Sequence, residues 1–580
     1  MRVSCGAMKL GEGHESGHVI DRHPVFAFSH DLVEALCELS PVSATFIGVR
    51  GYDHRWDDFT PAGHAARAAS LRAFSDRLLA LPPASDDDSA LAIRVHREYL
   101  DERIEFHAEG DPLLDLNNIA STFQILALVF DFMDASSVAG ISAIAARFEG
   151  FSDAALGYRA LLAEGLARRR VVARRQVEAA IAQGRVKTAV SFARTIAEAS
   201  RALPGVDADL AARVDHAAER NHPAHAELPD WPERVYLAGA TDEDGVGRER
   251  YERSMRRHLG ATFDPIALHQ WGWEEVRRIE STMREVARTI TPGATVREVA
   301  DALANDPSQS LAIPEPFLES MRERQMRALA QLDGAHFDVP AILRKVDVKL
   351  APAGGKPGAY YSPPSEDFSR PGTVWYSPGQ RRALPLWQEI TTAYHEGFPG
   401  HHLQVAMQVY LESRLTRFQR LLADWPGYAE GWALYAEQLM LELGFFEKPE
   451  YVLGMHAAQL ARACRVVVDI GLHLGLTIPG DTDFHPGKTW SFEIAVEMMR
   501  DRALLDPEVA ESEIVRYLGW PAQAISYKVG QRVILELRAE CMQREGAAFD
   551  LKRFHAAVVG VGGVGLNTLR ETLAPRSNVP

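Results

Sequence analysis

The sequence has few cysteines and no long apolar run. Its 580 residues include four cysteines, Cys5, Cys37, Cys464 and Cys541, and no two of them form a CxxC pair. That spacing argues against a disulfide framework or a thiolate zinc site and fits a reducing compartment. The lack of any run of about 18 apolar residues argues against a membrane span. Met1–Gly13 also lacks the apolar core of a secretory signal. We therefore expect a cytoplasmic protein without a membrane partner.

The sequence also has fewer basic than acidic residues. The chain carries 63 Lys and Arg against 79 Asp and Glu, which gives a net charge of −16 at pH 7. Nucleic-acid binding needs cationic patches that displace counterions, so we expect no nucleic-acid partner. The rest of the composition is that of a folded protein, with 46% hydrophobic residues. A chain of this length can bury a large core and enclose a deep cleft.

Three regions of the chain differ in their residue pattern. Residues 1–23 are rich in Gly and His without periodicity, which predicts a flexible tail. Residues 24–345 carry apolar residues every three to four positions, which is typical of helices. In residues 346–580, two strand-like segments, Val346–Leu350 and Thr373–Tyr376, precede a return to helical patterning. The pattern predicts a mainly α protein with a small β element.

The most unusual segment is HEGFPGHHLQ, residues 395–404. Zinc prefers imidazole nitrogen and carboxylate oxygen in a tetrahedral arrangement, and the common helical solution is H-E-x-x-H with Glu as general base. Here His395 and His401 are six residues apart, so an unbroken helix would turn them about 120° away from each other. Two glycines and a proline lie between the histidines and interrupt the helix. A bulge of about two residues would return His401 towards His395.

The remaining ligands follow from spacing and burial. His402 would share the face of His395, but about 10.5 Å further along the axis, so we take His401 as the ligand and His402 as its alternative. Glu430 follows a Pro-Gly turn at the head of an apolar helix, where a carboxylate needs a partner. Glu437, two turns later, could orient a histidine. The predicted site is one zinc ion held by His395, His401 and Glu430.

Two other motifs match known patterns in an unsuitable context. Residues 14–18 read H-E-x-x-H but lie in the predicted tail, without an amphipathic run around them. Gly560–Gly565 reads G-x-G-x-x-G, but too few residues follow it for a dinucleotide-binding βαβ unit. We interpret it as a turn between two helices whose role stays open.

The segment from His395 to Gln404, together with Glu430–Tyr435, resembles the bacterial family called domain of unknown function 885. Further similar pieces are Tyr360-Tyr361, Ser369–Gly372, Asp469–His473 and Pro521–Gly530. The similarity runs from about Phe26 to Leu573. That family is similar to the gluzincin metallopeptidases and distantly to thimet oligopeptidase and angiotensin-converting enzyme.

The resemblance implies a large helical domain with a deep cleft and a small β-sheet next to the metal-binding helices. Residues 24–345 would form one wall of the cleft. Residues 346–580 would form the catalytic half, with the small sheet, the metal-binding helices and the C-terminal helices. The resemblance also favours His401 over His402 as the second histidine ligand.

The site predicts hydrolysis of an amide bond in short peptides or small amides. Zinc lowers the pKa of a bound water, and Glu396 is the expected general base. For the oxyanion donor, Tyr527 is the first candidate and His473 the second. The pattern fits Tyr527 equally well as an ordinary interior tyrosine, and it favours His473 as a satisfied core histidine over a catalytic one.

Three further residues are candidates for binding the substrate. Arg370 could clamp a substrate carboxylate, and Tyr360 and Tyr361 could line the cleft. Each of the three could instead stabilise its own loop. A carboxypeptidase would need a cationic clamp such as Arg370, whereas an aminopeptidase would need an acidic cluster such as Glu366-Asp367.

Two rival functions stay open at this point. One is a metal-dependent hydrolase or lyase of a specialised non-peptide metabolite that uses the same site. The other is a non-catalytic binding protein whose broken motif holds no metal, although the presence of Glu396 speaks against it. The sequence does not decide the metal's identity, or between a monomer and a homodimer.

Overall fold

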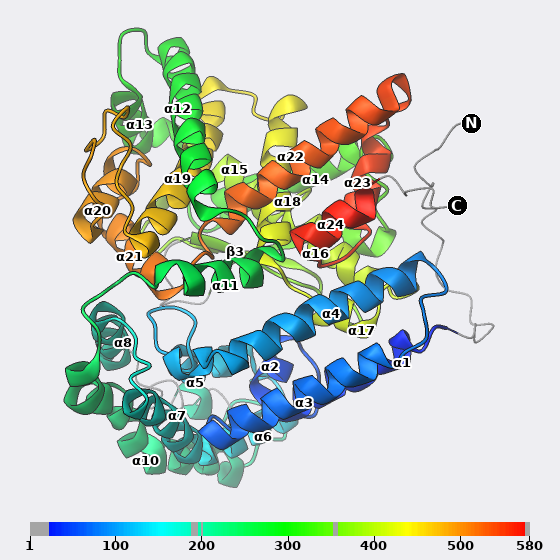
Figure 1. Cartoon of the computed structure of the whole chain (residues 1–580), viewed down its shortest axis with the longest axis vertical. Helices are drawn as coiled ribbons and strands as arrows, with labels where there is room; N and C mark the ends of the chain where they lie inside the picture. The colour runs from blue at the N-terminus through cyan, green and yellow to red at the C-terminus, as the bar shows by residue number, and fades with distance from the viewer. Residues whose placement is uncertain (1–21, 187–194, 199–200, 352–357, 575–580) are drawn as a thin grey trace.

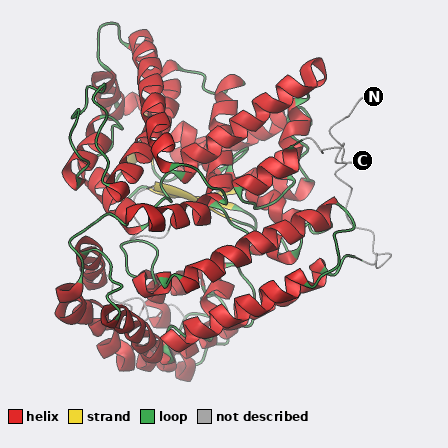
Figure 2. Ribbon diagram, viewed as in Figure 1, coloured by secondary structure: helices red, strands yellow, loops and turns green. Residues whose placement is uncertain are grey.

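The computed structural model describes residues 22–186, 195–198, 201–351 and 358–574. Within these ranges the chain is mainly helical with two small sheets, as the sequence predicted (Figures 1 and 2). The predicted tail falls outside the described residues up to residue 21, as does the H-E-x-x-H match at residues 14–18. No helix in the described ranges is long and apolar enough to cross a membrane.

The helices before the sheets are α1 (Val25–Leu39), α2 (Pro41–Phe46), α3 (Pro61–Leu79), α4 (Asp87–Ala108), α5 (Thr122–Leu128), α6 (Val138–Glu149), α7 (Phe151–Ala167), α8 (Arg174–Val186), α10 (Ala208–Trp231), α11 (Gly247–Leu259), α12 (Pro265–Ile290), α13 (Val296–Asn305) and α14 (Glu315–Leu332). The later helices are α15 (Leu386–Glu396), α16 (His401–Tyr410), α17 (Arg417–Leu421), α18 (Pro426–Glu442), α19 (Pro449–Leu474), α20 (Phe492–Asp501), α21 (Pro507–Gly519), α22 (Ser526–Glu545), α23 (Leu551–Val559) and α24 (Leu566–Leu573). Short helical turns are η1 (Asp111–Leu114), η2 (Val129–Phe132), η3 (Pro232–Tyr236), η4 (Leu237–Gly239), η5 (Pro307–Gln309), η6 (Ala341–Arg344) and η7 (Gly546–Ala548).

The strands form two small sheets close to α15. β2 (Asp347–Leu350) and β4 (Thr373–Ser377) are parallel, and β3 (Gly358–Ser362) pairs antiparallel with β4. Both strand-like segments of the sequence are therefore strands. β1 (Ser310–Ala312) pairs with β5 (Ala383–Pro385), which leads directly into α15. The sheets thus lie beside the helix that carries the first predicted ligand.

Buried apolar side chains of the described residues form two cores. The smaller core takes its side chains from Val42 to Tyr236. The larger core runs from Val25 to Leu573 and includes residues on both sides of position 345. Helices α11–α14 therefore share a core with the predicted catalytic half. The division of the chain at residues 345 and 346 stays a prediction.

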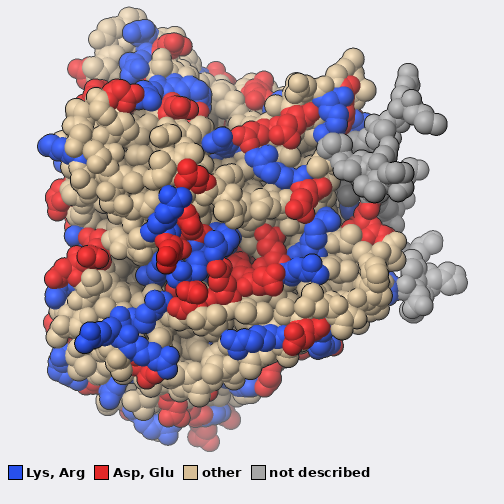
Figure 3. Space-filling model, in the orientation of Figure 1, with Lys and Arg blue, Asp and Glu red and all other residues tan. Residues whose placement is uncertain are grey.

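Charged side chains gather where α4 faces α11. Figure 3 shows acidic and basic side chains interleaved across the middle of this face of the molecule. Arg256 pairs with Glu105 at 2.6 Å, and Arg257 lies 3.8 Å from Glu102. A cavity of about 140 Å³ lies at this seam, and another of about 230 Å³ adjoins it at Arg250. The predicted metal ligands line neither cavity, so the deep cleft around them stays a prediction.

Helices α18 and α22 cross at glycines. Glu430 lies on α18 between Gly427 and Gly431, and Tyr527 lies on α22 three residues before Gly530. A Cβ atom on Gly530 would come within 1.8 Å of the Gly427 carbonyl oxygen, and one on Gly431 within 2.5 Å of the Gly530 carbonyl carbon. The two backbones therefore touch directly, and this contact sets the separation of Glu430 from Tyr527.

Replacing Gly530 by alanine should destabilise the protein, because the added methyl group has no space at this crossing. We expect the free energy of unfolding to fall by about 1–3 kcal/mol in urea denaturation. Gly480→Ala is the matched control, since a Cβ there would meet no atom within 4 Å, and it should change stability by less than about 0.5 kcal/mol. An unchanged stability for Gly530→Ala would show that the helices have room to separate.

Candidate metal centre

The helix that carries His395 stops where the glycines and proline of the motif begin. Helix α15 ends at Glu396, and α16 starts at His401. Gly400 permits the turn because a Cβ there would lie 2.0 Å from the carbonyl oxygen of His395. As the sequence predicted, no continuous helix joins the two histidines.

Two distant side chains hold this break in place. The Gln325 amide on α14 donates to the carbonyl of Ala393 at 2.5 Å and accepts from the backbone N–H of Phe398 at 2.6 Å. The Trp432 indole on α18 donates to the carbonyl of Pro399 at 2.9 Å. The N–H of Phe398 and the carbonyl of Pro399, which have no helical partner, are thus satisfied by side chains. These contacts tie the break to both neighbouring helices.

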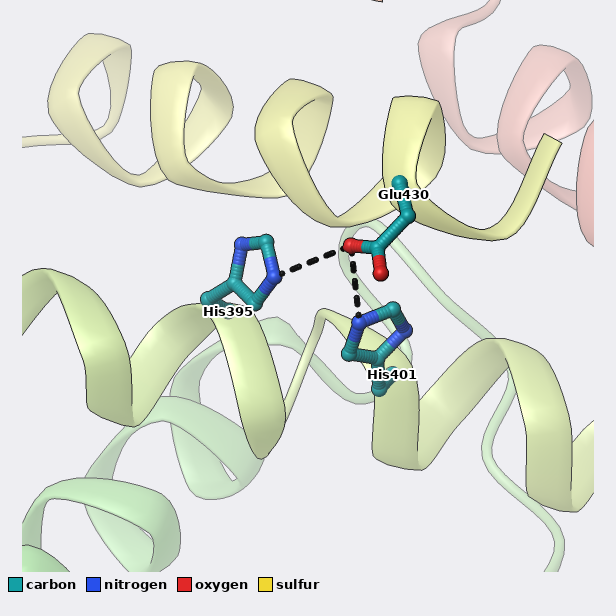
Figure 4. A group of neighbouring side chains, drawn as sticks. All are labelled: His395, His401 and Glu430. Carbon is teal, nitrogen blue, oxygen red and sulfur yellow. Dashed lines mark ion pairs between the residues drawn. The ribbon is translucent and has the colours of Figure 1, made fainter. Parts of the chain in front are cut away.

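The break brings both histidines to one carboxylate (Figure 4). Nε2 of His395 lies 3.3 Å from Oε2 of Glu430, and Nε2 of His401 lies 3.4 Å from the same oxygen. One ligand atom from each of the three residues lies within 4.8 Å of the others. In the described ranges, no other group of three His, Cys, Asp or Glu side chains approaches this closely.

Glu437 orients His395 through the ring nitrogen that does not point at Glu430. Nδ1 of His395 donates to Oε1 of Glu437 at 2.7 Å, and the Thr391 hydroxyl donates to Oε2 at 2.8 Å. Since a carboxylate only accepts, Nδ1 carries the proton. Nε2 then directs its lone pair at Glu430 unless a second proton or a metal cation lies between them.

The charges of the cluster favour a cation at this point. Burial alone would lower the pKa of His395, but its interactions with Glu430 and Glu437 raise that pKa to about 10. Burial would raise the pKa of Glu430, yet the charges of His401 and His395 hold it well below its usual range. The ionised carboxylate and the imidazoles therefore define a place for positive charge.

The donor set also fits zinc. Oε2 of Glu430 is buried and has no hydrogen-bond partner among the described residues. Zinc bonds of about 2.0–2.1 Å in a tetrahedral arrangement place ligand atoms about 3.3–3.4 Å apart. The separations of 3.3 and 3.4 Å from Glu430 to His395 and His401 match this requirement.

His402 lies outside the cluster. Its Nε2 donates to the carbonyl of Leu343 at 2.8 Å, and its Nδ1 accepts from the Tyr361 hydroxyl at 3.0 Å. Both ring nitrogens already have protein partners, so this alternative ligand has no free donor atom. The geometry favours His401 at the predicted ligand position.

Two of the predicted catalytic residues lie beside the cluster. Glu396 is the last residue of α15, is 9% exposed, and lies close enough to contribute to the raised pKa of His395. The Tyr527 ring lies 6.4 Å from the His395 ring, nearly parallel to it. Burial and the charge of Glu430 raise the pKa of Tyr527, which keeps its hydroxyl a proton donor.

The predicted substrate-binding residues lie on the side of the sheet. Tyr361 on β3 is engaged with His402, as described above. Tyr360 is 44% exposed and stacks on Trp375 at 6.2 Å. Arg370 is exposed in the loop between β3 and β4, and its charge reaches Tyr361. A substrate contact for these three residues stays a prediction.

His473 belongs to a separate buried network near the end of α19. Its Nε2 donates to the carbonyl of Tyr517 at 3.1 Å, and its ring lies 5.5 Å from that of Tyr251. One turn earlier, Asp469 accepts from the Tyr251 hydroxyl at 2.6 Å and from the N–H of Ala522 at 3.1 Å. These contacts tie α19 to α11, to α21 and to the turn before α22. The role of His473 as an oxyanion donor stays a prediction.

The sequence reasoning missed two polar residues around the cluster. Gln459 on α19 donates to Oε2 of Glu437 at 3.4 Å and accepts from Lys528 at 2.9 Å. Asp424 is close to Glu430, whose charge, after burial, raises the pKa of the aspartate. A single glutamine within an apolar helix was a usable signal for Gln459; the loop position of Asp424 offered none.

The Gly560–Gly565 segment is the turn between α23 and α24, as the sequence predicted. A Cβ on Gly563 would lie 1.9 Å from the carbonyl oxygen of Ala423 and 2.9 Å from the side-chain nitrogen of Gln408. The turn therefore packs tightly against the loop after α17 and against α16.

Asp469 should make stability depend on pH. Burial raises its pKa to about 7, above the unfolded value of about 3.9, so the folded state holds this proton more tightly. Its contribution to the free energy of unfolding is greatest below about pH 4 and is lost as pH rises to about 7. Urea unfolding at pH 5 and pH 8 should show a smaller loss of stability for Asp469→Asn than for wild type. Asp481→Asn, on an exposed side chain, should keep the wild-type difference; an equal loss in all three proteins would contradict the assignment.

The fold is shared with solved structures, and the family is set by the sequence. A structure described as that of a "putative lipoprotein" from Colwellia psychrerythraea is 24% identical, with a TM-score of 0.83 over 95% of this chain and 98% of that one. Another, of a "putative lipoprotein of unknown function" from Shewanella oneidensis, is 19% identical, with a TM-score of 0.72 over 94% and 99%. No curated protein matches the chain. The family model described as "Bacterial protein of unknown function (DUF885)" matches residues 41–573, and the chain therefore belongs to the DUF885 family.

Proposed function

We propose that this protein is a zinc-dependent hydrolase that cleaves an amide bond in short peptides or small amides. The observation that carries the proposal is the convergence of His395 and His401 on Oε2 of Glu430, a buried oxygen without a hydrogen-bond partner among the described residues. The similarity to gluzincin metallopeptidases is part of the same proposal. Glu396 adds a general base that a purely structural metal site would not need.

The residues of the site fall into zinc ligands and residues that orient those ligands. His395, His401 and Glu430 would hold one zinc ion, which supplies a Lewis acid and an activated water when bound. Glu437 holds the proton on Nδ1 of His395, so that Nε2 stays free to act as a ligand. The polar groups behind Glu437 keep it ionised and oriented.

Proton transfer falls to the residues beside the cluster. The carboxylate of Glu396 would accept a proton during attack and return it to the leaving amine. The Tyr527 hydroxyl, held protonated by its raised pKa, would donate to the developing oxyanion. We keep a cytoplasmic location, with no nucleic-acid or membrane partner, as part of the proposal.

A second candidate function uses the same metal site on a specialised non-peptide metabolite, as a hydrolase or lyase. Tight zinc binding without turnover of any peptide would favour it. A non-catalytic binding protein is the third candidate, and a chain that takes up no zinc would favour that one.

The purified protein should hold about one zinc ion per chain. His395→Ala and His401→Ala should lose the metal, because each removes one ligand. His402→Ala is the matched control and should keep it, since its ring nitrogens are engaged by Leu343 and Tyr361. Mass spectrometry of the metal content, with circular dichroism to check folding, makes the comparison. If His401→Ala keeps the metal and His402→Ala loses it, His402 is the ligand and His401 is not.

Glu396→Gln should separate metal binding from catalysis. We expect zinc content to stay unchanged while the kcat for a cleaved peptide falls by about 10²- to 10⁴-fold, the usual contribution of a positioned general base. Steady-state kinetics on a substrate found with a peptide library would measure this. Glu571→Gln, on an exposed side chain of α24, should keep full activity; a Glu396→Gln variant with wild-type kcat would remove Glu396 from the mechanism.

A further inference from the structure

Helix α19 presents a row of polar side chains to the candidate metal centre. Gln459 reaches Glu437, the carboxylate that orients His395. Residues three positions apart lie on the same face of a helix, so Arg462 follows Gln459 on this face. The charge of Arg462 reaches Glu437 and Tyr527, where it lowers the pKa of each against the effect of burial. The row therefore runs from behind the first ligand towards Tyr527.

Two arginines of this row lie near the Tyr527 ring. The guanidinium carbon of Arg465 lies 4.9 Å from the ring centre, and that of Arg462 lies 5.9 Å from it. Arg465 is fully engaged, because it donates to the Tyr517 hydroxyl and to Glu513, each at 2.9 Å. Its position and hydrogen bonds make it a structural residue.

Arg462 lacks such partners. It donates to the carbonyl of Ala458 at 3.2 Å, its Nε is buried without a hydrogen-bond partner, and no carboxylate of the described residues forms an ion pair with it. Glu513 is already engaged by Arg465 and Arg516, and Glu437 is engaged by His395 and Thr391. Among the described residues, Arg462 is thus left with a single backbone acceptor. A partly buried guanidinium of this kind is suited to a bidentate contact with a carboxylate.

The spacing from the metal centre suits a peptide. An extended chain advances about 3.3–3.6 Å per residue. The steps from the His395 ring to the Tyr527 ring, 6.4 Å, and from that ring to Arg462, 5.9 Å, each correspond to about two residues or fewer. A peptide with its scissile amide at the cluster would bring a free C-terminus to Arg462 within a few residues.

The acidic residues that an aminopeptidase would use, Glu366 and Asp367, have protein partners. Glu366 lies 3.3 Å from Arg417 and 3.6 Å from Arg420. Asp367 accepts hydrogen bonds from the hydroxyls of Ser365 and Ser369 at 2.7 Å each. Glu366 is thus engaged by two arginines, and Asp367 uses one carboxylate oxygen to hold its own loop. Both carboxylates therefore have structural roles, which weakens the aminopeptidase hypothesis from the sequence.

We propose that Arg462 binds the C-terminal carboxylate of the substrate, and that the protein is therefore selective for peptides with a free carboxylate one to three residues beyond the scissile amide. The proposal rests on the hydrolase function proposed above. It replaces Arg370, the clamp that the sequence suggested, by a residue of α19. Arg370 is exposed to water and lies near Tyr361, the tyrosine that engages His402.

Binding of an acid and its amide tests this assignment. The zinc-loaded Glu396→Gln variant would be titrated by calorimetry with N-acetyl-tetra-alanine and with its C-terminal amide. The acid should bind about 10- to 100-fold more tightly, as expected for a hydrogen-bonded ion pair. Adding Arg462→Gln should reduce this preference to about one, and Arg462→Lys should leave an intermediate preference, because the charge remains and the planar fork is lost. Arg370→Gln is the matched control and should keep the full preference.

Other results of this binding experiment would contradict either the role of Arg462 or the proposed peptide substrate. Equal binding of acid and amide, with wild type still cleaving both peptides, would remove the role of Arg462 and leave the hydrolase function in place. If Arg370→Gln loses the preference for the acid while Arg462→Gln and Arg462→Lys keep it, Arg370 and not Arg462 binds the carboxylate. If neither peptide binds the zinc-loaded protein, the peptide substrate proposed above fails, and the assignment of Arg462 fails with it. Thermal melts of both Arg462 variants would show that the comparison is made on folded protein.

Discussion

Two carboxylates in the interior of the protein, one buried and one half-buried, impose the central constraint on this structure. Glu430 and Glu437 lie on one helix, two turns apart, and a buried carboxylate is costly unless hydrogen-bonded positive charge accompanies it. His395 lies between them, with one ring nitrogen directed at each. The ends of α15 and α16, the break between them and the polar row of α19 are all arranged so that these two charges are compensated. The chemistry proposed for the site uses that compensation.

The local parts of this arrangement were predictable from the sequence. Helical periodicity gave the mainly α fold, and two short alternating segments gave β2 and β4. The interruption between His395 and His401 followed from counting residues per turn and from the helix-breaking residues between them. Glu437 was expected behind a histidine from its distance along α18. The helices, the strands and the break depend on interactions within one element or between consecutive elements, where spacing carries the information. For Glu437 the informative spacing was that from Glu430 on the same helix.

The long-range parts were not predictable, for an equally physical reason. Gln325 supports the break from 73 positions away in the chain. The partners that engage His402 come from η6 and β3, and the contact between α18 and α22 depends on glycines about 100 residues apart. Arg462 and Arg465 look alike in the sequence, and only the placement of Glu513 and Tyr517 separates a structural arginine from one without an acidic partner. Such pairings depend on the packing of elements, which no local pattern encodes.

The engagement of His402 has a consequence for which histidine the proposed zinc ion would bind. Two adjacent histidines offer a metal ion two different rings, and His401 is the one that lies beside Glu430. Here the hydroxyl of Tyr361 and the carbonyl of Leu343 take up both nitrogens of the second ring. If the proposed zinc ion binds, His401 is the histidine of this pair with a ring nitrogen beside Glu430. β3 and η6 thus keep the second histidine away from the proposed metal site, although neither element contributes a ligand to it.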